Sequence, residues 1–536
     1  MAQSRTLRPD WLPAVALSAL LAAAMMAWNP QVGDLAAQVF RTELFQRGGL
    51  AIWNGSWYGG HYTLTYSFLF PPLAALLGPQ LVGTLAVVSS SYLFDRLVRD
   101  RWGDGARLAT LWFAAGVVTL LADGQLTFAL GVAFGLATIR ALQLDRPKLA
   151  LAAAAACALS SPVAAAFLAG TVFVGALERG RPLARSAVWV AAIALGLVLI
   201  PNLAFPESGQ FPFTFSSYVA IPLWCGSALF VTRGVAAEER DLRWVIAAYM
   251  LAATVVWLVP NPMGGNAVRL GALFGGPLVA AVVLARRPRV SPWFLTLFLA
   301  GGLYWQLTAS VNQIARSVGD PSTKSAYFQP LTEWLDAHGG PGVRVEVPPT
   351  ANHWEAAYLA PGIELARGWL RQLDTTRDDI FYAEENLSHP GYRNWLQDNA
   401  IRYVALPDAP LDYSSVAERR LILDAPSYLD LRWRSEHWRV YSVRGAKPIM
   451  QPLAGAEAST RWIGHQGFAL DVERPGEFLV RVNFTPYWSV SQGNGCLARR
   501  GGWTVAHAES SGVFRVAADF SLGRAWDAVT GAKKTC

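Results

Sequence analysis

The sequence predicts a polytopic α-helical membrane domain, followed by an extracytoplasmic α/β domain and an extracytoplasmic β-sandwich domain. The chain is 53% hydrophobic and only 15% charged, whereas an ordinary soluble protein carries about 25% charged residues. The deficit lies in residues 11–309, while residues 310–536 have an ordinary soluble composition. We therefore expect a membrane domain over residues 1–310 with a juxtamembrane loop at 29–68, an α/β domain over 311–446 and a β-sandwich over 447–536.

The apolar segments predict about eleven membrane helices, because a helix needs about 20 apolar residues to cross a bilayer. The candidate spans are residues 11–28, 69–95, 107–122, 125–142, 148–160, 163–177, 187–204, 217–232, 243–259, 269–285 and 292–309. The break at Ser160-Ser161-Pro162 divides a run that is too long for one helix. The first stretch is long, lacks a clean small-x-small cleavage site before Trp28 and is followed by more apolar segments, so we expect a retained helix rather than a signal peptide.

The basic residues predict the orientation of these spans. If the spans alternate, one side carries Arg5, Arg8, Arg96, Arg99, Arg101, Arg107, Arg140, Arg146, Lys148, Arg179, Arg181, Arg185, Arg233, Arg240, Arg243, Arg286, Arg287 and Arg289. The other side carries only Arg41, Arg47 and Arg269. Basic residues favour the cytoplasm, so we expect a multi-pass membrane protein with a cytoplasmic N-terminus. An odd number of spans is needed to place the N-terminus and the soluble part on opposite sides of the membrane. This number requires residues 148–177 to form a hairpin of two short helices.

This topology also explains the formal net charge of +7. The soluble part has no Lys/Arg-rich run and no aromatic-basic repeat, so we expect membrane lipids as partners and no nucleic acid.

The long outside loop at residues 29–68 is the most informative segment of the sequence. Asp34 follows Gly33 as a natural N-cap of a helical pattern over 34–47. Residues 53–66 are rich in glycine and in the aromatic side chains that favour the membrane interface. We therefore expect two juxtamembrane helices that lie flat on the outer face.

The motifs of this loop resemble a known enzyme superfamily. The chain reads Asp-x3-Gln-x2-Arg from Asp34, Trp-Asn-x2-Trp-Tyr-Gly-Gly-His from Trp53, and Tyr-Ser-x2-Phe-Pro-Pro from Tyr66. An acidic residue after the first membrane helix, followed by juxtamembrane helices, resembles the GT-C superfamily of membrane glycosyltransferases, and these motifs are similar to an actinobacterial branch. The soluble part is similar to that of YfhO-type membrane glycosyltransferases.

The resemblance implies transfer of a sugar from a polyprenyl-phosphate carrier to a cell-envelope glycan or lipid acceptor, on the outer face of a bacterial plasma membrane. It places Asp34 at the catalytic acidic position. A single carboxylate is enough as general base, because the phosphate leaves without an acid. The phosphate requires positive charge or hydrogen-bond donors, and Arg269, His61 and Arg41 are the candidates on the outside. The alternatives are a helix cap for Asp34, a loop contact for His61, snorkelling for Arg269 and a helix-surface charge for Arg41.

Further polar and aromatic residues are candidates for the acceptor or a metal. The acceptor candidates are Trp57, Tyr58, Asn266, Arg367, Trp369, Arg371 and Asp374. A salt-bridged structural loop is an equal alternative for residues 367–374. The sequence defines no certain cofactor, and a divalent metal held by Asp34 with Glu207 is left open. Asp123 lies at a tight outside turn, where a helix cap is the favoured interpretation and a position in the lining of the site is the alternative. Cys496 and Cys536 are candidates for a disulfide if the soluble part is outside the cytoplasm.

The soluble part reads as alternating helices and strands and then as strands alone. The α/β pattern predicts helices at 328–338 and 391–399, strands at 343–347 and 401–406, and a hairpin at 433–443. The sandwich pattern predicts strands at 468–472, 477–484, 503–505 and 512–516. A lipid or glycan transporter or flippase, and a non-enzymatic envelope scaffold, are the competing functional hypotheses.

Overall fold

The structure is a computed structural model that describes residues 11–178, 181–207, 209–383, 387–531 and 536. The chain divides into two compact units. The first, here called the helical unit, comprises Met1–Gln38, Tyr66–Leu199 and Gln210–Ala315. The second, here called the mixed unit, comprises Val39–Thr65, Ile200–Gly209 and Arg316–Cys536. The loop at 29–68 and the end of one long helix therefore belong in part to the mixed unit.

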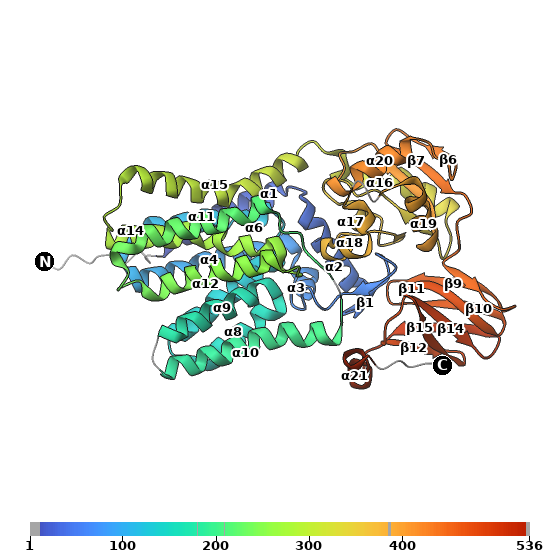
Figure 1. Ribbon diagram of the computed structural model, residues 1–536, viewed down its shortest axis with the longest axis horizontal. Coiled ribbons are helices and arrows are strands. Elements are labelled where there is room, and N and C mark those ends of the chain that lie inside the picture. Colours follow the sequence, from blue (N-terminus) through green and yellow to red (C-terminus); the bar gives the residue numbers. More distant parts are fainter. Residues whose placement is uncertain (1–10, 179–180, 208, 384–386, 532–535) are drawn as a thin grey trace. The chain divides into compact units, whose positions relative to one another are not determined.

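Helices dominate the first part of the chain (Figure 1). Among the described residues, eight helical segments are long and apolar enough to cross a membrane, and they are Pro79–Trp102, Asp104–Ala122, Leu126–Gln143, Arg185–Ala204, Phe215–Val235, Arg240–Leu258, Gly264–Arg286 and Pro292–Ser317. Helices α1 (Leu12–Trp28) and α2 (Gly33–Gly48) meet the same criterion only as a pair, bent by 79°. By length and composition, these helices of the described chain could therefore cross a membrane.

The remaining expected spans are shorter helices. The segment at 148–177 is divided as its Pro162 predicts, into α8 (Pro147–Ser160) and α9 (Pro162–Glu178). Where one span was expected at 69–95, α3 (Phe70–Leu77) and α4 (Pro79–Trp102) are separated by Gly78 at a φ of 86°. The other helices are α5 (Arg107–Gly116), α6 (Thr119–Ala122), α7 (Leu126–Gln143), α10 (Arg181–Ala204), α11 (Phe215–Val231), α12 (Arg240–Leu258), α13 (Val268–Leu270), α14 (Gly276–Arg286) and α15 (Pro292–Ser317).

A π-helical turn, η4 (Gly271–Gly275), joins α13 to α14. Its glycines lie against large aromatic rings: a Cβ on Gly271 would lie 2.5 Å from the Trp305 ring, and one on Gly275 would lie 2.8 Å from the Trp224 ring. Small residues allow apolar helices to approach closely. The packing of these rings therefore fixes the segment that begins with Arg269.

The mixed unit contains a five-stranded sheet in the order β4-β3-β5-β7-β6. Its strands are β3 (Arg344–Glu346), β4 (Glu364–Leu365), β5 (Ile401–Pro407), β6 (Leu429–Arg434) and β7 (Trp438–Val443). β3 is parallel to β4 and β5, and β7 is antiparallel to β5 and β6. Its helices include α16 (Ser325–His338), α18 (Arg371–Arg377), α19 (His389–Asp398) and α20 (Val416–Leu423). The sequence predictions for α16, β3, α19, β5 and the β6–β7 hairpin are confirmed.

Two four-stranded sheets follow, in the orders β12-β15-β10-β9 and β13-β14-β11-β8. The strands are β8 (Met450–Pro452), β9 (Glu457–Gly464), β10 (Gly467–Arg474), β11 (Gly476–Asn483), β12 (Trp488–Gln492), β13 (Gly495–Arg500), β14 (Trp503–Ala508) and β15 (Gly512–Ala518). Inward residues such as Phe468, Phe478 and Phe514 form a shared core. The four strands expected here are β10, β11, β14 and β15.

The prediction of a second juxtamembrane helix at 53–66 was wrong. That segment is a two-stranded hairpin in which Trp53 of β1 (Trp53–Asn54) pairs with Tyr62 of β2 (His61–Tyr62). Tyr58, Gly59 and Gly60 have φ values of 57°, 67° and 109°, a backbone that reverses the chain and cannot continue a helix. Trp53 and Tyr62 join the core cluster that contains the sandwich phenylalanines. Tertiary packing therefore decides the conformation of this segment.

Candidate functional site

The candidate site in the helical unit begins at the N-terminus of α2. The turn at Asn29-Pro30 separates α1 from α2, and Asp34 lies in the first turn of α2 with its side chain about one-third exposed. A carboxylate at this end of a helix is stabilised by the free backbone N–H groups. Gly33 is already helical, so Asp34 is a first-turn residue rather than the N-cap that the sequence predicted.

Arg269 supplies the positive charge beside Asp34. It lies in α13, and its Nη2 is 3.9 Å from Asp34 Oδ2. The guanidinium carbon lies 5.3 Å from the centre of the Phe128 ring, near the start of α7. An arginine in an apolar segment is costly unless it has such partners. The predicted pair of Asp34 and Arg269 thus comes together in the structure.

A second carboxylate, Asp123, belongs to the same group. The turn between α6 and α7 carries Asp123 and Gly124, and a Cβ on Gly124 would lie 2.5 Å from the backbone nitrogen of Leu35. This turn therefore packs directly against the first turn of α2. Asp123 is 7% exposed, and its Oδ1 has no hydrogen-bond partner among the described residues.

The surroundings of Asp123 favour its neutral form. Burial raises the pKa of the Asp123 carboxyl to about 7; the negative charge of Asp34 adds to this rise, while Ser310 and Arg269 oppose it. A carboxyl group that titrates near neutrality is suited to proton transfer or to hydrogen-bond donation. The sequence had favoured a helix-cap role for Asp123, yet the N-cap residue of α7 is Gln125. The only sequence signal was the position of an acid in a tight turn on the predicted outside.

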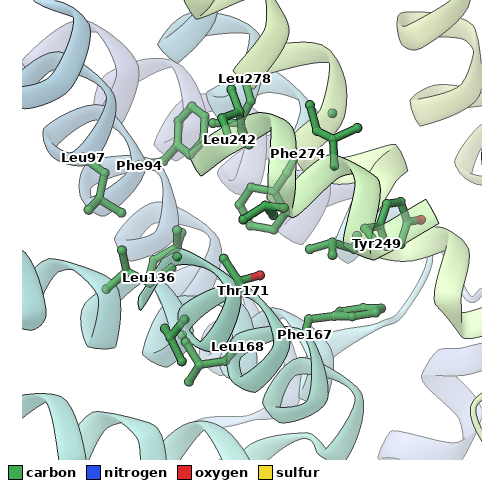
Figure 2. Close-up of a pocket in the computed structure, with 18 of the residues that line it drawn as sticks. Phe94, Leu97, Leu136, Phe167, Leu168, Thr171, Leu242, Tyr249, Phe274 and Leu278 are labelled. Carbon is green, nitrogen blue, oxygen red and sulfur yellow. The ribbon is translucent and has the colours of Figure 1, made fainter. Parts of the chain in front are cut away.

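An apolar cavity of about 320 Å³ lies within the helical unit (Figure 2). Its walls carry Phe94 and Leu97 from α4, Leu136 from α7, Phe167, Leu168 and Thr171 from α9, Leu242 and Tyr249 from α12, Phe274 from η4 and Leu278 from α14. Phe128 also lines the cavity and contacts Arg269. The cavity therefore shares a wall with the charged group of Asp34, Asp123 and Arg269.

His61 does not fit the phosphate-binding role expected of it. Its side chain is buried in the mixed unit, where Nδ1 lies 2.9 Å from the Tyr62 carbonyl oxygen and Nε2 lies 3.1 Å from Asn54 Nδ2. The pKa of His61 is lowered to about 3, mainly by burial; the charges of Arg377 and Arg41 contribute to this fall, and the contact with the Tyr62 carbonyl opposes it. A neutral imidazole with both nitrogens engaged is a structural group.

Trp57 and Tyr58 are also structural residues. The Trp57 ring is fully buried and stacks on Phe40 and His61, with centroid distances of 4.2 Å and 5.7 Å. The Tyr58 hydroxyl donates to the Gly368 carbonyl oxygen at 2.7 Å. The structure thus joins this hairpin to the segment around residue 368, but neither aromatic ring is open to a sugar.

The segment with Arg367 and Arg371 forms a network of buried ion pairs. Arg367 holds both oxygens of Asp374 at 3.0 and 2.6 Å, and Arg371 holds both oxygens of Asp412 at 2.9 and 2.8 Å. The Trp369 ring stacks on His353 at a centroid distance of 3.5 Å. Bidentate pairs of this kind fix a loop. The structure therefore favours the salt-bridged alternative over acceptor binding.

Glu207 is engaged within the mixed unit. Its Oε1 accepts from Arg377 at 2.5 Å and its Oε2 accepts from the Tyr62 backbone N–H at 2.7 Å. Both oxygens are therefore occupied. Within the described part of the chain, no group of three or more His, Cys, Asp or Glu residues is arranged to hold a metal ion. The metal shared by Asp34 and Glu207 stays a prediction to which this geometry lends no support.

Arg41 lies in the second half of α2, where its charge contributes to the low pKa of His61. Asn266 is buried in the helical unit, in a short 3₁₀ helix (Gly264–Ala267) that precedes Arg269. Cys496 and Cys536 are joined by a disulfide in the mixed unit, while Cys157 and Cys225 are free and buried.

The chain was also compared with known proteins. None of the protein-family models matches it, and the comparison with curated proteins finds no match.

Proposed function

We propose that the chain is a membrane glycosyltransferase that moves a sugar from a polyprenyl-phosphate carrier to a glycan or lipid acceptor of the cell envelope. The observation that carries this proposal is the meeting of Asp34, Asp123 and Arg269 beside an apolar cavity. A lipid-linked sugar phosphate is apolar at one end and anionic at the other. The cavity suits its chain, and Arg269 suits its phosphate.

In the proposed reaction, Asp34 accepts the proton of the acceptor hydroxyl. The hydroxyl oxygen attacks the anomeric carbon of the sugar, and the bond from that carbon to the phosphate oxygen breaks. The lipid phosphate leaves with the bonding electron pair, so no acid is required. Arg269 stabilises the negative charge that develops on the departing phosphate. Asp123 in its neutral form adds no second negative charge beside that phosphate.

The positions of the basic residues and the disulfide support an outer-face site. Arginines gather at one set of helix ends, which favours the cytoplasm for that side. The Cys496–Cys536 bond suits an oxidising compartment for the mixed unit. Polyprenyl-phosphate sugars reach such a site by diffusion within the plasma membrane. Multi-pass insertion with a cytoplasmic N-terminus is part of the proposal.

The test is transfer of radiolabelled sugar from a panel of polyprenyl-phosphate donors by the purified chain in liposomes. Asp34→Asn removes the proposed base with little change of shape, and we expect transfer to fall below detection while the thermal unfolding midpoint is retained. Asp145→Asn, at an exposed turn, is the matched control and should keep full activity. Full activity of Asp34→Asn would refute the base assignment. Movement of the intact lipid or glycan across the bilayer without any transfer product would support a transporter instead.

A further inference from the structure

The last helix in the described chain, α21 (Leu522–Thr530), has an apolar face that is exposed on the protein surface. Leu522, Trp526 and Val529 are 81%, 68% and 50% exposed. Their spacing of four and three residues places them on one side of the helix. A stripe of three large apolar side chains at this exposure marks a contact with something outside the described chain.

The helix is firmly attached to the sandwich. Ala525 and Ala528, on the neighbouring side of the helix, pack against the core cluster of the sandwich. Ser521 caps the N-terminus by accepting from the Arg524 backbone N–H at 3.2 Å, and Gly531 ends the helix at a φ of 67°. The disulfide from Cys496 to Cys536 ties the chain beyond the helix back to β13. The exposed stripe is therefore a feature of a fixed element.

The attachment point is the end of a helix with the length and composition of a membrane span. The Phe520 ring stacks on Tyr487 at 6.1 Å and contacts Phe205 at the same distance. The Tyr487 hydroxyl donates to the carbonyl oxygen of Ala204, the last residue of α10, at 2.7 Å. All of these residues belong to the mixed unit.

The final turns of α10 are themselves apolar and exposed. Ile200 and Leu203 are 65% and 60% exposed, as expected for side chains that face lipid at the edge of a bilayer. One continuous set of contacts thus links the exposed apolar end of α10 to the helix that carries the stripe. Tryptophan in particular favours the boundary between head groups and acyl chains.

We propose that α21 is an interfacial membrane anchor, whose face of Leu522, Trp526 and Val529 inserts into the lipid leaflet in which α10 ends. The occupant of this face is lipid rather than a second copy of the chain or another protein. Amphipathic helices with such a face lie in the plane of the interface. The inference rests on the membrane residence of the helical unit and is independent of the proposed sugar transfer.

The test places single nitroxide labels on the full-length chain in nanodiscs that hold one copy each. The background carries Cys157→Ala and Cys225→Ala and keeps the native disulfide. Labels at Leu522→Cys, Trp526→Cys and Val529→Cys are compared with Gly523→Cys, off the stripe, and Ser510→Cys, in the exposed turn between β14 and β15. Oxygen concentrates in the bilayer and a nickel chelate stays in water. Oxygen should therefore increase the electron-spin relaxation rate of the three stripe labels more than the nickel chelate does. The Ser510 label should show the reverse.

Two outcomes overturn the proposal. If the stripe labels respond to the two reagents as the Ser510 label does, the stripe lies in water. If neither reagent changes their relaxation, the stripe is covered by protein. A measurement on the unaltered chain covers the case in which a variant does not fold. A lipid with a photoreactive group on its acyl chain should label peptides that contain α21, and an α21 peptide without label would reject the anchor.

Discussion

The guanidinium group of Arg269 lies 3.9 Å from the carboxylate of Asp34, although the two residues are far apart in the sequence. Arg269 is held by the Phe128 ring and by the glycine-rich π turn that follows it. Asp34 is held by the first turn of α2, against which Gly124 packs. Each side chain is thus positioned by rigid elements, as an anion-binding group requires.

Replacement of Arg269 by glutamine should weaken binding of the donor. A hydrogen bond to a charged group contributes about 1.5–3 kcal/mol, so we expect the KM for a polyprenyl-phosphate sugar to rise by about tenfold to a hundredfold. Arg269→Lys should recover part of the loss, because the charge remains while the planar fork is lost. Arg287→Gln, at an exposed arginine, is the control. An unchanged KM in Arg269→Gln would remove the phosphate-binding role.

Asp123 should make donor binding depend on pH near neutrality. Because its pKa is raised to about 7 by burial, the carboxyl is neutral below that pH and charged above it. The added negative charge should repel the donor phosphate, so the KM of the wild-type chain should rise between pH 6 and pH 8.5, by roughly tenfold for a charge contact of about 1.4 kcal/mol. Asp123→Asn cannot ionise and should show a flat KM over this range. Asp145→Asn should keep the wild-type rise of KM with pH. An equal rise in Asp123→Asn would show that Asp123 is not the titrating group.

The helices and many strands were predictable because their causes are local. Continuous apolar runs define the long helices, and Gly339 follows the last residue of α16 where the sequence placed its end. The hairpin at 53–62 was not predictable in this way. Its aromatic residues join a core built mostly from residues beyond 400, and no local pattern contains that information.

In the candidate site, too, positions with a local cause were predictable and those that depend on tertiary packing were not. Asp34 and Arg269 were found from their positions at predicted outside helix ends, and the structure brings them together. The role of Asp123 depends on the approach of its turn to α2 and of Ser310 from α15, which is tertiary packing. For His61 the sequence left phosphate binding and a loop contact open. The structure shows the loop contact, because the buried Nδ1 lies 2.9 Å from the Tyr62 carbonyl oxygen.

A bulky residue in the cavity should select against long-chain donors. Leu168 lines the cavity and is 4% exposed (Figure 2). Leu168→Trp should narrow the cavity, and overpacking of this kind costs about 1–3 kcal/mol. We expect the KM for a long polyprenyl donor to rise by about tenfold or more, with little change for a donor with a short chain. Leu199→Trp, at a position on α10 that is 57% exposed, should affect neither donor. Equal effects of Leu168→Trp on both donors would show that the cavity does not hold the chain.

Buried carboxyl groups in the mixed unit should make the stability of the chain fall as the pH rises. Glu346 is fully buried, and within the described part of the chain neither of its oxygens has a hydrogen-bond partner. Arg367 lies nearby, with Nη1 4.0 Å from Glu346 Oε1. Burial raises the pKa of Glu346 well above its ordinary value, and the charge of Glu418 raises it further. The folded state therefore holds a proton that the unfolded chain releases. The stabilisation is complete below the unfolded pKa of about 4.3 and is lost as the pH rises toward the folded value.

Glu346→Gln removes this titration, so its melting temperature should decline less than that of the wild-type chain between pH 6 and pH 9. Each kcal/mol of unfolding free energy that the variant retains corresponds to a melting temperature higher by about 2–4 °C, or less in a chain of this size. Glu333→Gln, at an exposed position on α16, should follow the wild-type decline. The measurement is differential scanning fluorimetry of the full chain in detergent, with the pH range limited by the stability of the micelle. Parallel declines in wild type and Glu346→Gln would show that Glu346 is not the group that takes up the proton.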